Sequence, residues 1–523
     1  MAILAPRPLT YSDLDRESDQ IADRIVKTLG DSSPIPVGFL FKQGPTQLIV
    51  TLAILKSGHI AVPLDSAFPH ARLNFMIRDS KSQMLITDTE NTQLAQSLVG
   101  SKLTLLNIDE IDRSAEPPKH NPALSSESPS HLLYTSGSTG KPKGVIQTHQ
   151  NILQMVWSAS HSYKVTHEDR VALLFSCGFA ASLTPMFLAL LNGATSCPFN
   201  VKDDLLSLPD WLIDKQISIY MSVPTIFRHV ARSLGKRDQK APMRMIILGG
   251  EPVLRQDIDL YKRFLPDECQ LNVRLAGTEM LRLRSFPIHK STQLAGNIVP
   301  VGFHVDDKQV LLLNDEGDEV PTGEIGEITV ISSYLSPGYW NQPELTQAAF
   351  QDKGDNTGER IYRTGDLGRL SETGCLEHLG RKDFLVKIRG NRVELGEIES
   401  AILDLPTVDA TATRAITSAE RGTYIAAYVV MKSGEEFNMN RLRAHIASTL
   451  PDYMIPAYIV QLETLPLTAT GKVNRKLLPD PEPDKSAVSS DYIPPETALE
   501  VELHKIWIDV LKVKRLGIND DFY

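Results

Sequence analysis

The sequence predicts an α/β protein, with a large N-terminal α/β domain and a smaller C-terminal α+β domain. Up to about residue 380, amphipathic helical stretches alternate with short apolar runs at residues 36–41, 131–134 and 243–248, which is typical of α/β folds. The chain has 523 residues, a length that favours two to four folded units rather than one.

After residue 383 the elements change in order and length. Residues 384–388 and 424–431 are predicted strands, and residues 397–405 and 439–450 are predicted helices. The stretch 479–495 is rich in Pro, Ser and Asp and has few apolar residues, which is typical of a linker. The predicted boundaries are 1–382 for the large domain, 383–480 for the small domain, 481–494 for the linker and 495–523 for part of a third unit.

The third unit is predicted to start with a capped helix. Thr497 and Glu500 have the spacing of a capping box, in which each side chain bonds to the backbone of the other. Leu499, Leu503, Ile506 and Val510 fall on one face of this helix. That face needs further chain to pack on, so we expect residues 495–523 to be the truncated start of a neighbouring domain.

Composition and charge exclude several classes of function. The formal net charge is −10 without a basic stripe, which disfavours nucleic acid as a partner. The four cysteines are scattered and lack zinc or redox spacing, so a reducing, cytoplasmic location is expected. Residues 171–191 are mostly apolar, but Gly178 and Pro185 interrupt them; a buried segment is favoured over a membrane helix, and no membrane partner is expected.

The segment 134–144, YTSGSTGKPKG, is the most informative part of the chain. Its glycines let backbone amides approach an anion closely, and its hydroxyls and lysines add donors and positive charge. This combination suits a polyphosphate. It differs from a Walker loop, because Pro142 rather than Ser or Thr follows Lys141.

Further segments precede and follow this loop in a fixed order; they are residues 9–11, 55–58, 62–65, 323–327, 362–367, 380–383, 386–390, 397–399, 450–456 and 470–475. Together with the loop they resemble the motifs of the adenylate-forming superfamily, which includes acyl-CoA ligases, luciferases and the adenylation domains of nonribosomal peptide synthetases. The match extends from residue 9 to about residue 480.

The resemblance implies ATP and Mg²⁺ as cofactors and gives each motif residue a role. The expected phosphate-binding residues are Thr135, Ser136, Gly137, Ser138, Thr139, Gly140 and Lys143. The residues expected around adenine and ribose are Gly250, Glu251, Leu275, Ala276, Asp366 and Arg381. An aromatic residue normally stacks on adenine at the position of Leu275, so this chain departs from the family there.

Three further roles concern the reaction itself. The resemblance implies that the Thr278 hydroxyl contacts the α-phosphate and that the Glu279 carboxylate holds magnesium, which prefers oxygen ligands. Lys472 would bridge the substrate carboxylate and the α-phosphate as charge builds during attack. Asp383 falls at the family's hinge, where rotation of the small domain would replace Lys472 with residues 386–392 for thioester formation.

The predicted substrate pocket also departs from the family. Domains that activate α-amino acids usually carry Asp directly after Phe179, where it pairs with the ammonium, but this chain has Ala180 and no acidic residue in 175–191. A buried, unpaired ammonium would cost several kcal/mol, so an α-keto, α-hydroxy, aryl or aliphatic acid is expected. The other predicted wall residues are Ala181, Thr184, Met221, Ile247, Gly249, Arg274, Arg282 and Leu283.

Two questions stay open at this point. If Arg274 or Arg282 points into the pocket, it could bind a keto oxygen or a second carboxylate of the substrate. If both face solvent, they say nothing about the substrate. Residues 492–495 and 517–523 resemble the start of a peptidyl carrier domain, which favours loading of a fused carrier's phosphopantetheine within a multimodular synthetase. The alternatives are a ligase for free coenzyme A and a degenerate scaffold domain; dependence on a small helper protein is undetermined.

Overall fold

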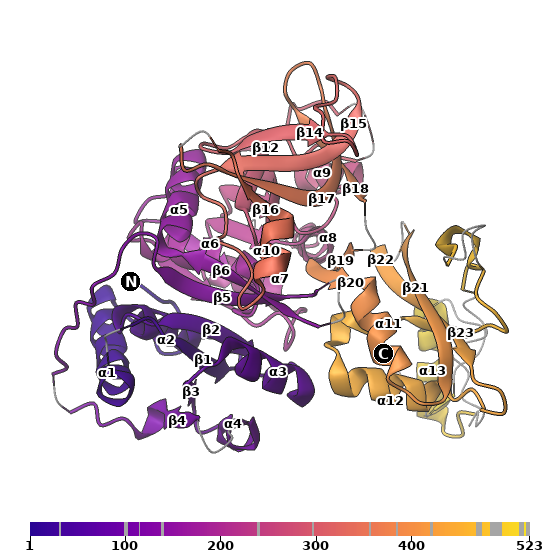
Figure 1. Cartoon of the computed structure of the whole chain (residues 1–523), viewed down its shortest axis with the longest axis horizontal. Coiled ribbons are helices and arrows are strands. Elements are labelled where there is room, and N and C mark those ends of the chain that lie inside the picture. Colours follow the sequence, from indigo (N-terminus) through magenta and orange to yellow (C-terminus); the bar gives the residue numbers. More distant parts are fainter. Residues whose placement is uncertain are drawn as a thin grey trace. The chain divides into compact units, whose positions relative to one another are not determined.

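The fold was taken from a computed structural model of the whole chain. It describes residues 1–523 apart from 31–32, 99–102, 115, 138–140, 238–240, 295, 297, 355–356, 383–384, 419–421, 467–472, 482–493, 512–516 and 519–523. The chain divides into two compact units, Met1–Glu394 and Leu395–Tyr523. Each is described by itself, and Figure 1 shows their elements along the chain.

The first sheet of the larger unit has the strand order β4-β3-β1-β2-β5-β6. Its strands are parallel except for the last pair. The strands are β1 (Pro36–Phe41), β2 (Ile60–Asp65), β3 (Met84–Thr87), β4 (Thr104–Asn107), β5 (Pro129–Thr135) and β6 (Lys143–Thr148). The helices that alternate with its first strands are α1 (Tyr11–Leu29), α2 (Pro45–Lys56), α3 (His70–Ser80) and α4 (Thr92–Leu98). The continuous apolar strands β1 and β2 are buried along their whole length, as expected for parallel strands covered on both faces.

The second sheet has the order β13-β12-β11-β10-β9-β7-β8. Its parallel part consists of β7 (Arg170–Leu173), β8 (Thr195–Pro198), β9 (Ile219–Ser222), β10 (Met245–Leu248) and β11 (Gln270–Gly277). The antiparallel strands β12 (Leu281–Ile288) and β13 (Phe303–His304) complete it. The helices of this region are α5 (His149–Tyr163), α6 (Leu183–Leu190), α7 (Leu208–Asp214), α8 (Pro224–Leu234) and α9 (Arg255–Phe264).

Helix α5 packs against helix α6 and against strand β12 of the second sheet. It begins at an N-cap, where the Thr148 hydroxyl accepts a bond from Asn151 N at 3.2 Å, and it ends where Lys164 adopts φ 49°. Its last turns thereby present Ser158, Ser162 and Tyr163 towards the edge of the second sheet.

The third sheet corrects one expectation. The α/β alternation ends at about residue 270, and most of the following elements up to residue 381 are antiparallel strands rather than alternating helices and strands. This sheet contains β14 (Gln309–Leu313), β15 (Ile325–Ser332), β16 (Phe350–Asp352), β17 (Arg360–Leu370) and β18 (Leu376–Arg381), with the short helix α10 (Pro343–Ala349) before β16. Short apolar runs separated by Gly and Pro fit antiparallel meanders as well as α/β units, so the pattern alone did not separate the two.

A hairpin of β19 (Leu385–Ile388) and β20 (Asn391–Glu394) ends the larger unit. Arg389 and Gly390 form its two-residue turn, and both have positive φ, 49° and 79°. Paired positive φ values are the signature of a turn whose twist matches that of the flanking strands.

The smaller unit contains α11 (Leu395–Leu403), β21 (Val408–Ser418), β22 (Gly422–Met431), α12 (Met439–Thr449) and β23 (Tyr458–Gln461). The strand order is β21-β22-β23. The expected helices and strands of this region are present, with ends shifted by a few residues. Helix α13 (Ala498–Leu511) begins with the expected capping box, since Glu500 N donates to the Thr497 hydroxyl and Thr497 N to the Glu500 carboxylate.

The apolar segment 171–191 does not form one helix. It contains strand β7 and helix α6, and its α6 side chains are buried inside the larger unit. No helix in the described ranges combines the length and the apolar character needed to cross a membrane.

Candidate active site

The predicted phosphate-binding loop connects β5 and β6, whose ends Thr135 and Lys143 are paired in register. Residues 138–140 of this loop lie outside the described residues. Gly137 is required here, because a Cβ at this position would lie 2.2 Å from the Lys141 carbonyl oxygen. The Thr135 hydroxyl is buried and has no hydrogen-bond partner in the described part of the chain, so it is available to a ligand.

Ser136 fastens the β19–β20 hairpin to this loop. Its hydroxyl donates to the Arg392 carbonyl oxygen at 2.8 Å and accepts from the Glu394 amide at 3.2 Å. Both partners lie within the larger unit. These two bonds use the backbone of the hairpin, so they do not depend on the hairpin's side chains.

Glu279 lies at the centre of a buried charged cluster in the β11–β12 turn. Its side chain is 1% exposed and accepts bonds from Arg392 Nη1 at 2.8 and 2.9 Å and from the Tyr339 hydroxyl at 3.0 Å, while Lys143 Nζ lies 3.8 Å away. Leu281, in the same turn, has φ 52°, a left-handed conformation that costs a non-glycine residue about 1 kcal/mol. Strain of this kind concentrates at functional sites.

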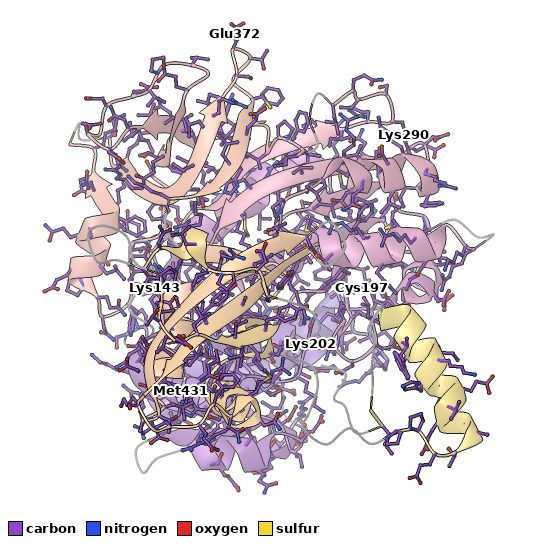
Figure 2. The ribbon with its side chains drawn as sticks, turned by 90° about the vertical axis from the view of Figure 1, so that its right-hand side faces the viewer. Lys143, Cys197, Lys202, Lys290, Glu372 and Met431 are labelled. Carbon is purple, nitrogen blue, oxygen red and sulfur yellow. The ribbon has the colours of Figure 1, made fainter. Side chains whose placement is uncertain are left out.

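The cluster sets the protonation of its members. Burial acts to raise the pKa of Glu279, but the positive charges of Arg392 and Lys143 outweigh that effect and hold the pKa at about 2. Burial, reinforced by Arg392, lowers the pKa of Lys143 to about 8. Lys143 also lies 4.2 Å from the centre of the Tyr339 ring, and Figure 2 shows where it lies in the larger unit.

A second charged group lies at the base of the β17–β18 hairpin, where Asp366 pairs in register with Arg381. The hairpin turn near Glu372 is at the opposite, outer end (Figure 2). Arg381 Nη1 donates to Asp366 at 2.8 Å, and His378 Nε2 lies 3.4 Å from the same carboxylate. Burial acts to raise the pKa of Asp366, but His378 and Arg381 outweigh it and hold the pKa well below its usual range.

This environment keeps Asp366 an ionised acceptor, as the predicted role at the ribose hydroxyls requires. Lys387 on β19 lies between the Glu279 cluster and the Asp366–Arg381 pair in its electrostatics, because the charges of Asp366, Arg381 and Arg392 all affect its pKa. The hairpin therefore lies within electrostatic reach of both Glu279 and Asp366.

The predicted adenine-binding residues have mixed environments. Gly250 follows β10 with φ 87°, and an added Cβ would lie 3.3 Å from Val223 and 3.4 Å from Gly390. Glu251 accepts bonds from the backbone and hydroxyl of Thr225, which lies in the first turn of α8. Leu275 is buried in the core of the third sheet, whereas its neighbour Ala276 is half-buried.

The predicted acid-binding residues gather around α6 and the second sheet. Ala180 and Ala181 form the short turn before α6, and Met221 and Ile247 are neighbours in register on β9 and β10. Leu283 lies elsewhere, because it faces the core of the third sheet. Arg282 instead donates to the Ser158 and Ser162 hydroxyls of α5, so Leu283 and Arg282 do not line one surface.

A buried carboxylate, Asp65, lies beside residues 175–182. It accepts bonds from the Ser176 hydroxyl at 2.7 Å and the Ala67 amide at 2.9 Å, and Lys202 Nζ lies 3.8 Å away. Two of the roughly four acceptor positions of this carboxylate are thus used within the protein.

Arg274 and Arg282 both point inward. Arg274 is 8% exposed and donates to the Thr184 hydroxyl at 3.1 Å; Arg282 is 2% exposed and donates to the Ser158 and Ser162 hydroxyls, each at 3.0 Å. The outward, solvent-facing alternative is excluded. Since the strand register shifts between Leu275 and Ala276, the direction of these side chains could not be counted from the sequence.

Lys472 and Asp383 lie outside the described residues, so their predicted roles stay predictions. The half-buried Thr278 is described, and its carbonyl oxygen accepts a bond from Gln147 at 2.6 Å. Sequence reasoning missed Tyr339 and the side-chain role of Arg392. Arg392 lies two residues after a recognised motif segment, but its partner Glu279 is 113 residues away, and no local pattern marks Tyr339.

Two family models match the chain. The model of the AMP-binding enzyme family matches residues 2–340, and that of the AMP-binding enzyme C-terminal domain matches residues 397–472. The chain belongs to the AMP-binding enzyme family and is an adenylate-forming ligase.

Relatives and solved structures are similar over nearly the whole chain. Tyrocidine synthase 1 from Brevibacillus parabrevis is 32% identical over 99% of this chain and 47% of its own length, and gramicidin S synthase 2 from Brevibacillus brevis is 33% identical over 98% and 11%. The chain thus spans less than half of these relatives. A four-domain nonribosomal peptide synthetase, holo-AB3403, bound to AMP and glycine, is 27% identical with a TM-score of 0.64, over 100% of this chain and 38% of that one.

A further solved structure shares the fold. NpsA-ThdA, an artificially fused adenylation-PCP di-domain from Klebsiella oxytoca, has a TM-score of 0.77 at 22% identity, over 88% of this chain and 89% of that one.

Proposed function

We propose that this chain is the adenylation part of a nonribosomal peptide synthetase, and that it activates an acid without an α-ammonium for loading onto a carrier domain. The observation that carries the substrate assignment is Ala180, within a segment, 175–191, that has no acidic residue. The assembly-line context is supported by holo-AB3403, a nonribosomal peptide synthetase, and by the similarity to tyrocidine and gramicidin S synthases.

In the first half-reaction, an oxygen of the substrate carboxylate attacks the α-phosphorus of ATP. The bond from that phosphorus to the bridging oxygen breaks, and pyrophosphate leaves with the acyl-AMP as the other product. The chain's own contribution is electrostatic: the β5–β6 loop and Lys143 offer donors and positive charge to the phosphates, and Asp366 accepts from the ribose. Lys472 is assigned to the developing charge at the reacting carboxylate.

Glu279 was expected to hold magnesium, and the described arrangement does not fit that role. Both of its carboxylate oxygens accept from Arg392, and Lys143 adds further positive charge. A divalent cation would meet repulsion here as long as Arg392 stays in place. We therefore assign this arrangement to the second half-reaction, in which the hairpin covers the acyl-AMP.

In the second half-reaction, a thiolate attacks the acyl carbonyl carbon. The bond to the AMP oxygen breaks, AMP leaves with the electron pair, and a thioester forms. The mixed anhydride supplies the driving force, so no nucleophilic side chain is needed. The hairpin of residues 385–394 is bonded to Ser136 of the phosphate-binding loop. In this proposal it covers the acyl-AMP and keeps water away from it.

Competition between thiols tests this function. A carrier domain bearing phosphopantetheine would be added in trans together with free coenzyme A, MgATP and a non-amino acid. Mass spectrometry of both thiols should show the acyl mass increase on the carrier first. Faster acylation of coenzyme A would favour the alternative of an acyl-CoA ligase, and neither product with any acid would favour a degenerate scaffold.

A further inference from the structure

Arg274 and Arg282 are buried cations whose hydrogen-bond partners among the described residues are all neutral. Arg274 donates to a threonine hydroxyl and Arg282 to two serine hydroxyls of α5. No carboxylate in the described ranges forms an ion pair with either guanidinium. Buried charges in proteins are normally paired, because an unpaired one loses most of its hydration energy.

Donors in this cluster also remain unused. A guanidinium has five N–H groups, and Arg282 Nε is buried without a partner among the described residues. Within the same described part of the chain, the buried Tyr163 hydroxyl has no partner either, and the Tyr163 ring centre lies 5.0 Å from the Arg282 guanidinium. The Arg282 Nε and the Tyr163 hydroxyl are therefore two donors that have no acceptor among the described residues.

The surrounding residues are shaped for the arginines. Gly249 makes room for the Arg274 stem, since an added Cβ would lie 2.9 Å from Arg274 Cγ and from its carbonyl oxygen. Lys308, whose Nζ donates to the carbonyl oxygen of Arg282 at 2.8 Å, is a further buried basic group, and burial lowers its pKa to about 7. Burial lowers the pKa of Arg274; Tyr163 opposes this effect and the charge of Arg282 adds to it.

We infer that the acid activated by this chain carries a second anionic group, a carboxylate, and that Arg282 and Arg274 bind it. This rests on the proposed function and names its substrate class: a dicarboxylic acid, of which one carboxylate reacts and the other stays in the arginine cluster. A guanidinium fork binds a carboxylate through two parallel hydrogen bonds. The same positive charge would repel an α-ammonium, in agreement with Ala180.

The test compares short linear dicarboxylic acids with their methyl half-esters, which keep the length but remove the second charge. ATP–pyrophosphate exchange of the full chain should favour the diacid in kcat/KM by about 100-fold, the size expected for losing a buried, charge-assisted pairing. Arg282→Met should reduce this preference by at least about 10-fold, mainly through KM for the acid. Arg284→Met is the matched control, because Arg284 on β12 is likewise buried with an Nε that has no partner among the described residues, but it lies in register with Leu275 and His304 rather than beside the α5 hydroxyls.

Thermal unfolding with each acid, without ATP, separates this inference from the proposed function. The diacid should raise the Tm of the wild type and the control but not of Arg282→Met. If exchange is absent with every acid but this Tm pattern holds, the anion site stands and the proposed function fails. If half-esters or α-keto acids without a second carboxylate are used as well as diacids, or if Arg282→Met keeps the preference, the inference is overturned while the adenylation of a non-amino acid remains.

Discussion

The Arg392 guanidinium donates to both carboxylate oxygens of Glu279, at 2.8 and 2.9 Å, across 113 residues of sequence. Arg392 lies on the β19–β20 hairpin, and Glu279 is the residue that family resemblance assigns to magnesium. One carboxylate cannot serve a guanidinium and a divalent cation equally well at the same time. We propose on this basis that the hairpin, in this position, serves the second half-reaction.

Replacing Arg392 should separate the two half-reactions. In Arg392→Met, Glu279 is free for the metal, so half-maximal ATP–pyrophosphate exchange should need several-fold less Mg²⁺. Thioester formation from preformed acyl-AMP should slow by about 10- to 100-fold, because a buried charge pair that closes the site is lost. Rapid-quench assays of each step measure both effects; an unchanged magnesium requirement would contradict the competition between Arg392 and the metal.

Lys143 should make stability depend on pH. Its folded pKa of about 8 lies below its usual value, so between about pH 8 and 10.5 the unfolded state binds more protons than the folded state. Stability should therefore rise with pH across this window, by at most about 3 kcal/mol. Urea unfolding at several pH values should show this rise in the wild type and a smaller one in Lys143→Met; parallel curves would mean that Lys143 is not desolvated as described.

Ala180→Asp should restore the family's ammonium anchor. A carboxylate at this position would pair with an α-ammonium, so exchange with α-amino acids should appear or increase. Exchange with the native acid should fall by about 10-fold or more, because the new charge repels an anionic or electron-rich substrate. A matched Ala181→Asp variant controls for the general effect of a carboxylate in this turn. Equal acid profiles for both variants would show that residue 180 does not face the substrate.

The α/β class, helices α11 and α12, strand β22 and the α13 capping box could be predicted from the sequence, because these depend on local periodicity and cap chemistry. Strands β21 and β23 were not predicted. The antiparallel sheet after residue 270 was not predicted, because its strand pairings are set by tertiary contacts. The direction of Arg282 depends on a register shift between Leu275 and Ala276. Ordered motifs identified Glu279, but its partners Arg392 and Tyr339 are brought together only by the fold.

Magnesium-dependent ATP–pyrophosphate exchange decides whether the chain adenylates an acid without an α-ammonium. Ordinary α-amino acids would be paired with their α-keto, α-hydroxy and unsubstituted counterparts, together with aryl and fatty acids and with diacids. Lys472→Ala is the control. We predict exchange with a non-amino acid and its loss in the variant. Strong exchange with ordinary α-amino acids would contradict the proposed function, because another group would then have to anchor the ammonium beside Ala180.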